Sequence, residues 1–348
     1  MHAGVYADGG LSLQARPIPR PSRDDLLLRV RAASICATDL KIIAHGHFKI
    51  PPGTSRVLGH EFAGEVVQPS DAAPEVVEGM RVGVAPNFGC GRCDLCARGL
   101  DHLCASYEAL GISIDGALAD YVLVPAAAVR RGNVVPLPPA LPDEEAALVE
   151  PLSCVLNAHE AVRTGWGDRV LVFGAGPMGV MHLLVSRALG AASVVAVEPE
   201  SFRRAQARTF GADAVVTPEE VSDAVGEFTA GRGFDVVIVA VPAREPLEQA
   251  LAAAAALGRI HVFAGLTRGT APPILDANRI HYRQLTVTGT SGSSARQYRR
   301  AIDLAASGRL PLGRLVSVQL PLGELEEAFL RARAPDVLKV VIRPGGAP

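Results

Sequence analysis

The sequence lacks any excess of positive charge. Its 348 residues contain 34 Lys and Arg against 36 Asp and Glu, a formal net charge of -2, and no run of Lys or Arg resembles a basic arm. Proteins that bind nucleic acid draw affinity from cations that displace the counterions of the phosphates. The composition therefore argues against a nucleic-acid partner.

Also absent is an uninterrupted apolar run of about 18 residues, the length that a membrane-spanning helix needs. The opening residues, MHAGV, show no basic segment followed by an apolar stretch of the kind that directs secretion. These absences predict a cytoplasmic protein without a membrane partner. Because the cytosol is reducing, we expect the six cysteines to serve as thiols or metal ligands and not as disulfides.

What is present is a globular composition, with 49% hydrophobic and 20% charged residues. At roughly 150 residues per domain, the length suggests two domains. Up to about residue 152, short apolar runs such as 26–30 and 64–67 are interrupted by Pro, Gly and Asp. This pattern is typical of an antiparallel, barrel-like sheet.

From about residue 169, apolar strands alternate with Ala-rich helices, which is typical of a doubly wound parallel sheet. We expect the alanine run 252–256 to lie in a helix that stops at Gly258, and a further helix at 295–306. The sequence thus predicts an α/β protein with domains at 1–153 and 154–292 and a C-terminal segment, 293–348, that rejoins the first domain. The strands of the parallel sheet are expected at 170–173, 193–197, 214–216, 236–239, 260–263 and 285–288.

The strand at 170–173 runs directly into a glycine-rich turn, and an apolar helical pattern follows it as far as Gly190. A lone GxGxxG motif is weak, but a strand before it and a helix after it are the context of a dinucleotide-binding turn. Its glycines would permit the tight turn, the approach of a pyrophosphate and the packing of helix on strand. The residues expected to contact the cofactor here are Gly174, Gly176, Pro177, Met178 and Gly179.

The second strand ends at Glu198, about 20 residues beyond these glycines. A carboxylate at this point accepts hydrogen bonds from the hydroxyls of an adenosine ribose and repels a 2′-phosphate. Arg203 and Arg204 favour the opposite choice, since nearby arginines bind a 2′-phosphate, although they also suit a solvated helix face. We predict NAD in preference to NADP, with Glu198 and Arg203 beside it.

Four cysteines lie together in a short glycine-containing segment, about residues 88–106. Four thiolates close a tetrahedral zinc site and leave no position for a substrate. A structural zinc is therefore predicted in preference to iron or redox chemistry. The predicted ligands are Cys90, Cys93, Cys96 and Cys104.

A second group of possible ligands is dispersed along the chain: Cys36, His60, Glu61 and Glu150. Taken singly, these residues need no function: the cysteine could be a small buried hydrophobe, the histidine a core residue and a glutamate a solvated carboxylate. Together they offer soft, intermediate and hard donors for one zinc ion with an open position. Such an ion acts as a Lewis acid on a substrate oxygen, which favours hydride transfer from an alcohol to a nicotinamide.

At this point the sequence resembles the zinc-containing medium-chain dehydrogenases, most closely the branch of the sorbitol (polyol) and threonine dehydrogenases. The likeness covers nearly the whole chain. It rests on Cys36-x-Thr38-Asp39, the box Gly59-His60-Glu61-x2-Gly64, the four-cysteine segment, Glu150-Pro151-Leu152-Ser153 and the turn 174–179.

The resemblance implies a GroES-like barrel as the catalytic domain, a Rossmann domain, two zinc ions per chain and a homodimer or homotetramer. It implies that Cys36 and His60 bind the catalytic zinc, with Glu61 and Glu150 as direct or water-mediated ligands. Thr38 would then pass the substrate proton towards solvent. Where related enzymes often have a histidine at the end of this proton relay, the chain has Lys41, and His45 or His47 could replace it.

The predicted function is oxidation of a secondary alcohol in a polyol, cyclitol or sugar-derived molecule, with NAD as hydride acceptor. A threonine-type or amino-alcohol dehydrogenase is the alternative within enzymes. A non-catalytic nucleotide-binding protein of the same fold is the alternative from another class. Such relatives, like zinc-free quinone reductases, lose zinc ligands that this sequence retains.

Overall fold

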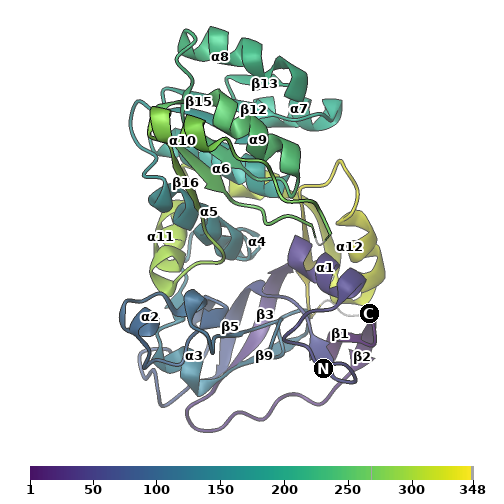
Figure 1. Ribbon diagram of the computed structural model, residues 1–348. Helices are drawn as coiled ribbons and strands as arrows, with labels where there is room; N and C mark the ends of the chain where they lie inside the picture. Colours follow the sequence, from purple (N-terminus) through teal and green to yellow (C-terminus); the bar gives the residue numbers. More distant parts are fainter. Residues whose placement is uncertain (268, 346–348) are drawn as a thin grey trace. The chain divides into compact units, whose positions relative to one another are not determined.

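The computed structural model describes residues 1–267 and 269–345, which divide into two compact units (Figure 1). Unit 1 contains Met1–Ser153 together with the described residues from Gly292 onward, and unit 2 contains Cys154–Ser291. Residues 346–348, the end of the predicted C-terminal segment, lie outside the described residues, as does residue 268.

Unit 1 is built on a sheet of the order β10-β6-β5-β3-β18-β17, in which β9 also pairs with β3. Its pairs are antiparallel except for β17 with β18, and a separate sheet has the order β2-β1-β4. The strands are β1 (His2–Ala7), β2 (Gly10–Ala15), β3 (Leu26–Ser34), β4 (Ser55–Val57), β5 (Glu61–Gln68), β6 (Arg81–Val84), β7 (Asn87–Phe88), β8 (Glu108–Ala109), β9 (Tyr121–Val124), β10 (Val134–Pro136), β17 (Val316–Pro321) and β18 (Lys339–Arg343).

The C-terminal strand β18 lies beside β3, with Val341 opposite Ser34 and Ile342 opposite Ala33. Both strands are buried, so the unit closes its core with residues from the two ends of the sequence. The helices of unit 1 are α1 (Ala37–His45), α2 (Asp94–Ala97), α3 (Ala126–Arg130), α4 (Asp143–Ala146), α11 (Ala295–Ala306) and α12 (Leu325–Arg331), while α5 (Val149–Ala161) begins in unit 1 and ends in unit 2.

Unit 2 is a six-stranded parallel sheet of the order β13-β12-β11-β14-β15-β16. Its strands are β11 (Arg169–Phe173), β12 (Ser193–Val197), β13 (Ala214–Val216), β14 (Phe234–Val239), β15 (Ala254–Val262) and β16 (Thr286–Gly289). Its helices are α6 (Pro177–Ala188), α7 (Ser201–Thr209), α8 (Val221–Thr229), α9 (Arg244–Ala253) and α10 (Ala277–Arg283). The predicted α/β fold class is thereby confirmed.

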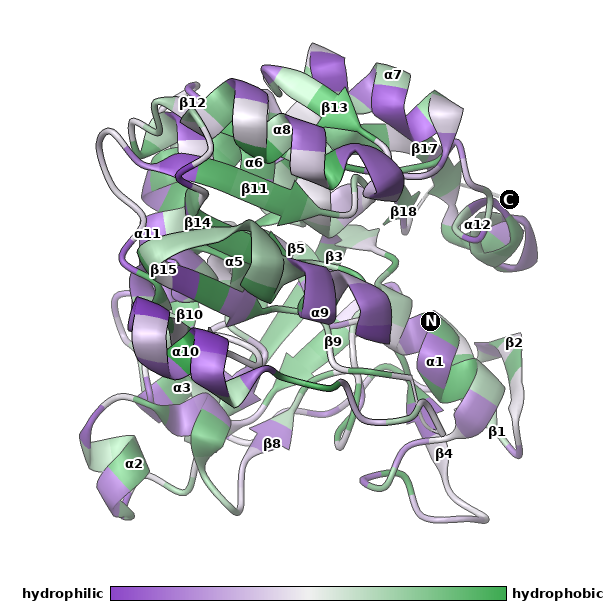
Figure 2. Cartoon of the chain, turned by 45° about the horizontal axis from the view of Figure 1, so that its top comes forward, coloured by the Kyte–Doolittle hydropathy of each residue, from purple (hydrophilic) through white to green (hydrophobic). Residues whose placement is uncertain are grey.

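The sheet of unit 2 is covered on both faces, which explains its continuous apolar strands. Along β11, Leu171 and Phe173 join one hydrophobic cluster, and Val170 and Val172 join another. Figure 2 shows most of β11 as hydrophobic, whereas much of α7 is hydrophilic. The strand order reverses between β12 and β14 around β11, the kind of point at which open α/β sheets bind ligands beyond the carboxyl ends of their strands.

The prediction of a helix through 252–256 was wrong. Helix α9 ends at Ala253, and β15 begins at Ala254, which pairs with Phe234 of β14. Alanine has a high helix propensity, but the burial of Ala254 and its pairing in the sheet outweigh that preference. Gly258 therefore lies inside a strand and does not end the helix.

Three histidines of unit 2, His159, His182 and His261, are almost completely buried, at 2%, 0% and 0% exposure. Burial lowers the pKa of His159 to about 3 and that of His261 to about 4, and it lowers the pKa of His182 well below 6.5. The three imidazoles are therefore neutral in the folded unit near pH 7.

These pKa shifts predict that acid destabilises the fold. As the pH falls below about 6.5, the unfolded chain binds protons at these histidines and the folded chain does not. Between pH 6 and pH 5, each buried histidine should lower the free energy of unfolding by about 1 kcal/mol. Urea unfolding followed by circular dichroism at pH 7, 6 and 5 measures this loss. His261→Asn should reduce the pH dependence, whereas His281→Asn, at an exposed position, should leave it unchanged. Identical pH profiles for the native chain and His261→Asn would contradict the assignment.

Candidate metal centres and nucleotide-binding turn

The first candidate centre joins the end of β3 to the start of β5. Cys36 caps the N-terminus of α1, two residues after β3, and His60 and Glu61 stand at the start of β5. Because Ser34 pairs with Glu61 in the β3–β5 register, the three side chains meet. One possible ligand atom from each of Cys36, His60 and Glu61 lies within 4.8 Å of the others.

Asp39 orients both Cys36 and His60 and is itself fully buried. Its Oδ2 accepts a hydrogen bond from the Cys36 backbone N–H at 2.9 Å, and its Oδ1 lies 3.6 Å from His60 Nδ1. This contact is longer than a hydrogen bond, but it places the carboxylate on the Nδ1 side of the ring, so Nε2 is the nitrogen that could bind a metal ion. Burial alone would lower the pKa of His60, but Cys36 and Asp39 raise it well above its usual range. The neighbouring acidic groups thus favour a positive charge at this place, which a bound metal ion would supply.

Lys339 supplies the cation nearest to Glu61. Its Nζ donates to Glu61 Oε2 at 2.5 Å and to the Ile35 carbonyl at 3.4 Å. It is the only buried Lys or Arg side chain among the described residues. Burial opposes its charge, but Glu61 and Cys36 outweigh burial and raise the pKa of Lys339. The lysine therefore stays charged and neutralises Glu61.

Glu61 Oε1 is buried and makes no hydrogen bond to the described residues. A thiolate, an imidazole nitrogen and a carboxylate oxygen at these separations suit zinc. The donor set thus fits the zinc ion implied by the sequence, and Oε1 is the oxygen of Glu61 that would reach it.

Glu150 lies in the first turn of α5 and is buried at 6% exposure. It is not among the three residues within 4.8 Å of one another. Burial of Tyr298 and, after it, the charge of Glu150 raise the pKa of Tyr298, and the charge of Glu150 also helps to raise that of Lys339. The charge of Glu150 therefore acts on the first centre, although Glu150 is not part of the group formed by Cys36, His60 and Glu61.

Thr38 lies in the first turn of α1, two residues after Cys36, and is half-buried. Sequence reasoning assigned no role to Asp39, Lys339 or Tyr298. Asp39 could have been found from its position three residues after the helix cap, where a side chain reaches back to the cap. Lys339 gave no local signal, because it depends on the pairing of β18 with β3.

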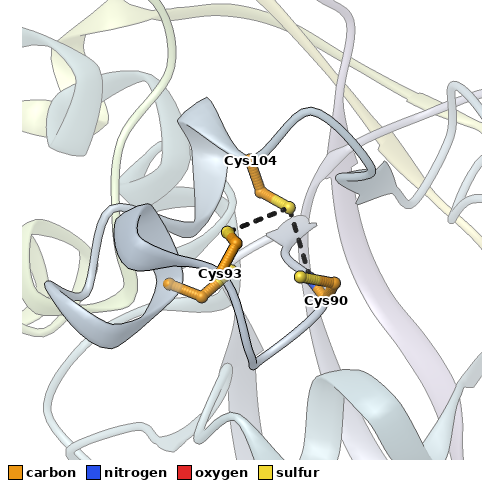
Figure 3. A group of neighbouring side chains, drawn as sticks. Cys90, Cys93 and Cys104 are labelled. Atoms are coloured by element: carbon orange, nitrogen blue, oxygen red, sulfur yellow. Dashed lines mark hydrogen bonds between the residues drawn. The ribbon is translucent and has the colours of Figure 1, made fainter.

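The second candidate centre is formed by four cysteines around α2, of which Figure 3 shows Cys90, Cys93 and Cys104. Their sulfur atoms all lie within 4.8 Å of one another, and the Sγ atoms of Cys93 and Cys104 are 3.8 Å apart. Backbone N–H groups of Arg92 and Cys93 lower the pKa of Cys90 to about 6, whereas burial raises that of Cys96 to about 12. The four thiols could all ionise only beside a balancing cation, which a structural zinc would provide.

Asp101 and Arg131 fasten this cysteine segment to the end of α3. The Arg131 guanidinium donates through Nε and Nη2 to Asp101 Oδ1, at 2.9 and 2.7 Å, and through Nη2 to the Cys96 carbonyl at 3.1 Å. Asp101 Oδ1 also accepts from the Gly89 backbone N–H at 3.3 Å. These contacts hold the cysteine segment at Gly89, before its first cysteine, and at Asp101, between its third and fourth cysteines.

The glycine turn after β11 has the geometry of a phosphate-binding loop. Gly174 has φ +97°, and a Cβ on Gly179 would lie 1.9 Å from the Gly174 carbonyl oxygen, so both positions require glycine. Gly176 caps α6, Pro177 is its first residue, and Met178 follows, half-buried. The turn thus presents a helix N-terminus, which attracts anions.

Glu198 and Arg203 lie beside this turn. The Glu198 carboxylate accepts hydrogen bonds from the backbone N–H groups of Ala175, at 2.8 Å, and Glu200, at 3.1 Å. A Cβ on Gly176 would lie 4.0 Å from Arg203 Nη1. The predicted cofactor residues of unit 2 are therefore gathered at one edge of the sheet.

Comparison with known proteins agrees with these features. Residues 22–139 match the family model of the alcohol dehydrogenase GroES-like domain, and residues 177–307 match that of the zinc-binding dehydrogenases. An L-threonine 3-dehydrogenase of Bacillus licheniformis is 34% identical over 346 residues, 96% of each chain.

Two solved structures superpose along nearly the whole chain. A zinc-binding dehydrogenase of Sinorhizobium meliloti bound to NADP, 32% identical, has a TM-score of 0.90 and 99% coverage of both chains. The 2R,3R-butanediol dehydrogenase of Bacillus subtilis, 26% identical, has a TM-score of 0.89 with the same coverage.

A barrel unit with two sets of zinc-type ligands and a parallel-sheet unit with a dinucleotide turn define the class of metal-dependent dehydrogenases. Within that class, the chain belongs to the zinc-containing medium-chain dehydrogenase family and is an oxidoreductase of the alcohol dehydrogenase type. Among the described residues, no helix has the length and apolar character required to cross a membrane.

The contacts of Arg131 predict its effect on metal retention. Arg131→Met keeps the aliphatic stem but leaves Asp101 without its cation, so the cysteine segment should lose zinc to a chelator about tenfold faster or more. Zinc release to a colorimetric chelator measures the rate. The matched control is Arg98→Met, which removes an exposed guanidinium of the same segment. Equal release rates for the two variants would show that Arg131 does not support the centre.

Proposed function

We propose that this chain oxidises a secondary alcohol flanked by a second polar group, as in a polyol, cyclitol or sugar-derived molecule, with NAD as hydride acceptor. The supporting observation is the first centre, where the Glu61 carboxylate meets Cys36 and His60 and the charge of the buried Glu150 acts on the neighbouring Lys339. Such a site is harder and more hydrated than a sulfur-rich one and suits a substrate with several hydroxyl groups.

In this proposal Cys36 and His60 hold a catalytic zinc, and Glu61 and Glu150 bind it directly or through water. The bound zinc would supply Lewis acidity that makes the substrate hydroxyl easier to deprotonate. Lys339 holds Glu61 Oε2, which keeps one oxygen of that carboxylate away from the metal. Thr38 accepts the proton of the substrate hydroxyl and passes it on. Cys90, Cys93, Cys96 and Cys104 hold a second, structural zinc.

The proposed preference for NAD rests on Glu198. Backbone N–H groups on two sides fix its carboxylate beside the glycine turn, where it would accept hydrogen bonds from ribose hydroxyls. A 2′-phosphate would meet the same carboxylate and be repelled. Arg203 is close enough to the turn to contact the phosphates of either cofactor.

A second candidate is an amino-alcohol substrate such as threonine, because the Bacillus licheniformis relative is an L-threonine 3-dehydrogenase. An amino group beside the reacting hydroxyl would replace the second hydroxyl of a polyol. A free amino acid also brings a carboxylate, and the buried cation of this unit, Lys339, is already paired with Glu61. We therefore favour an uncharged polyol-type substrate.

Removing the carboxylate of Glu198 should relax the cofactor preference. In Glu198→Ala, both the hydrogen bonds to the ribose and the repulsion of a 2′-phosphate disappear, so the ratio of kcat/KM for NAD over NADP should fall by about tenfold or more. Steady-state rates with the two cofactors measure the ratio. Glu227→Ala, at an exposed position on α8, is the control. A native enzyme that uses NADP more efficiently than NAD would refute the assignment.

A substrate panel tests the proposed reaction. Reduction of NAD, followed by absorbance, is measured with ethanol, 2,3-butanediol, sorbitol, xylitol, myo-inositol and L-threonine. We expect a polyol or cyclitol to give the highest kcat/KM and ethanol to be poor. L-Threonine as the best substrate would favour the second candidate, and ethanol as the best would contradict both.

Two substitutions on the best substrate test the proposed ligands. Glu150→Ala should lower kcat/KM by roughly tenfold to a hundredfold if it orients the metal, and more if it binds directly. Cys36→Ser should cost more activity and reduce the zinc content from two ions per chain to one. Glu227→Ala again serves as the control, and undiminished activity of Glu150→Ala would remove that residue from the site.

A further inference from the structure

The proposed reaction assigns no role to the three buried histidines of unit 2. They come from three elements: His159 from α5, His182 from α6 and His261 from β15. Imidazoles carry two polar ring nitrogens and are rarely buried without partners. Their presence in the interior therefore needs a physical explanation.

Hydrogen bonds arrange the histidines in two short chains. Thr164 Oγ1 lies 2.8 Å from His159 Nδ1, and His159 Nε2 lies 3.1 Å from His182 Nδ1. Separately, Thr290 Oγ1 lies 3.2 Å from His261 Nε2. Each chain ends on a buried ring atom, His182 Nε2 or His261 Nδ1, that has no hydrogen-bond partner among the described residues.

The two ends flank Phe263. The His182 and Phe263 rings pack edge to face, with centroids 4.5 Å apart and an interplanar angle of 87°, and the His261 ring centroid lies 6.2 Å from that of Phe263. Phe263 directly follows β15, at the edge of the sheet that also carries the glycine turn, and is half-buried. The histidines thus lie beneath the edge where a dinucleotide would bind.

His182 also belongs to the helix that begins at this turn. It lies five positions, about 7.5 Å of helix, after Pro177 at the N-terminus of α6. The same side chain thus belongs to the helix whose N-terminal N–H groups would face a pyrophosphate and packs against Phe263.

We propose that His159, His182 and His261 form a polar network that positions α6 and Phe263 for dinucleotide binding, completed by internal water at His182 Nε2 and His261 Nδ1. The inference rests on the proposed dinucleotide binding. The histidines are positioning residues, since they act on the cofactor through α6 and Phe263.

Water is the ligand that suits the end nitrogens of both hydrogen-bonded series. If the threonine hydroxyl donates to the first imidazole, the nitrogen at the far end of the hydrogen-bonded series carries a hydrogen. If the hydroxyl accepts, that nitrogen carries a lone pair. Water can accept from an N–H or donate to a lone pair, whereas a metal ion binds only the lone pair. The imidazoles also remain neutral, because burial lowers the pKa of each.

Titration with NADH, followed by nicotinamide fluorescence on the full-length protein, tests the positioning role. His182→Leu removes both polar nitrogens and should raise the dissociation constant about fivefold or more. His182→Gln places an amide at the level of Nε2 and should recover much of the affinity. The control His281→Leu removes an exposed histidine of α10 and should bind as the native chain does.

A spectroscopic measurement keeps the proposal testable if His182→Leu fails to fold. Imidazole ¹⁵N signals of the native protein should report three neutral rings, and those of His182 and His261 should shift when NADH is added. Unchanged ring signals at saturation, or native affinity in His182→Leu, would overturn the inference while leaving the dehydrogenase proposal intact. A native protein that binds neither NADH nor NADPH would refute both. A third metal ion per chain that is lost in His182→Gln would overturn the assignment of water.

Discussion

The burial of ionisable groups around Cys36 is the constraint on which unit 1 depends. Asp39 and Glu61 are fully buried, and His60 and Lys339 are nearly so. Isolated buried charges cost several kcal/mol each, so such a set persists only when charges are paired. Lys339 balances Glu61, and a divalent cation would balance the remaining acidic groups. The register of β3, β5 and β18 brings these charges together, so the architecture of the barrel and its chemistry have one electrostatic basis.

The four-cysteine segment is the other candidate centre of unit 1, and it has no open position for a substrate. Its helix α2 has only four residues and is too short to be stable by itself. Its conformation therefore depends on the four sulfur atoms and on the Asp101–Arg131 pair. In contrast, the first centre is built on long strands, which would hold its geometry during ligand exchange.

Much of this organisation could be predicted from short-range sequence patterns, because the glycine turn, the four-cysteine segment and the apolar strands are each local. The turn 174–179 and the strand before it are contiguous, so their geometry follows from residue type. The failures involve distant partners. Lys339 reaches Glu61 across 278 residues of sequence, and the strand beginning at Ala254 exists because Phe234 pairs with it. The buried histidines likewise show no periodic signal, since each occupies an ordinary core position of a different element.

The path of the chain also sets an order for synthesis on the ribosome. Unit 2 is one continuous stretch, whereas unit 1 needs β17 and β18, which follow unit 2 in the sequence. Domains tend to fold as their residues emerge, so the nascent barrel must wait for its last strands. Until β18 has been translated, β3 has an unpaired edge there and Glu61 has no lysine partner. Completion of the barrel is thus a late step that follows translation of β18, and the incomplete barrel is the species that chaperones would have to protect.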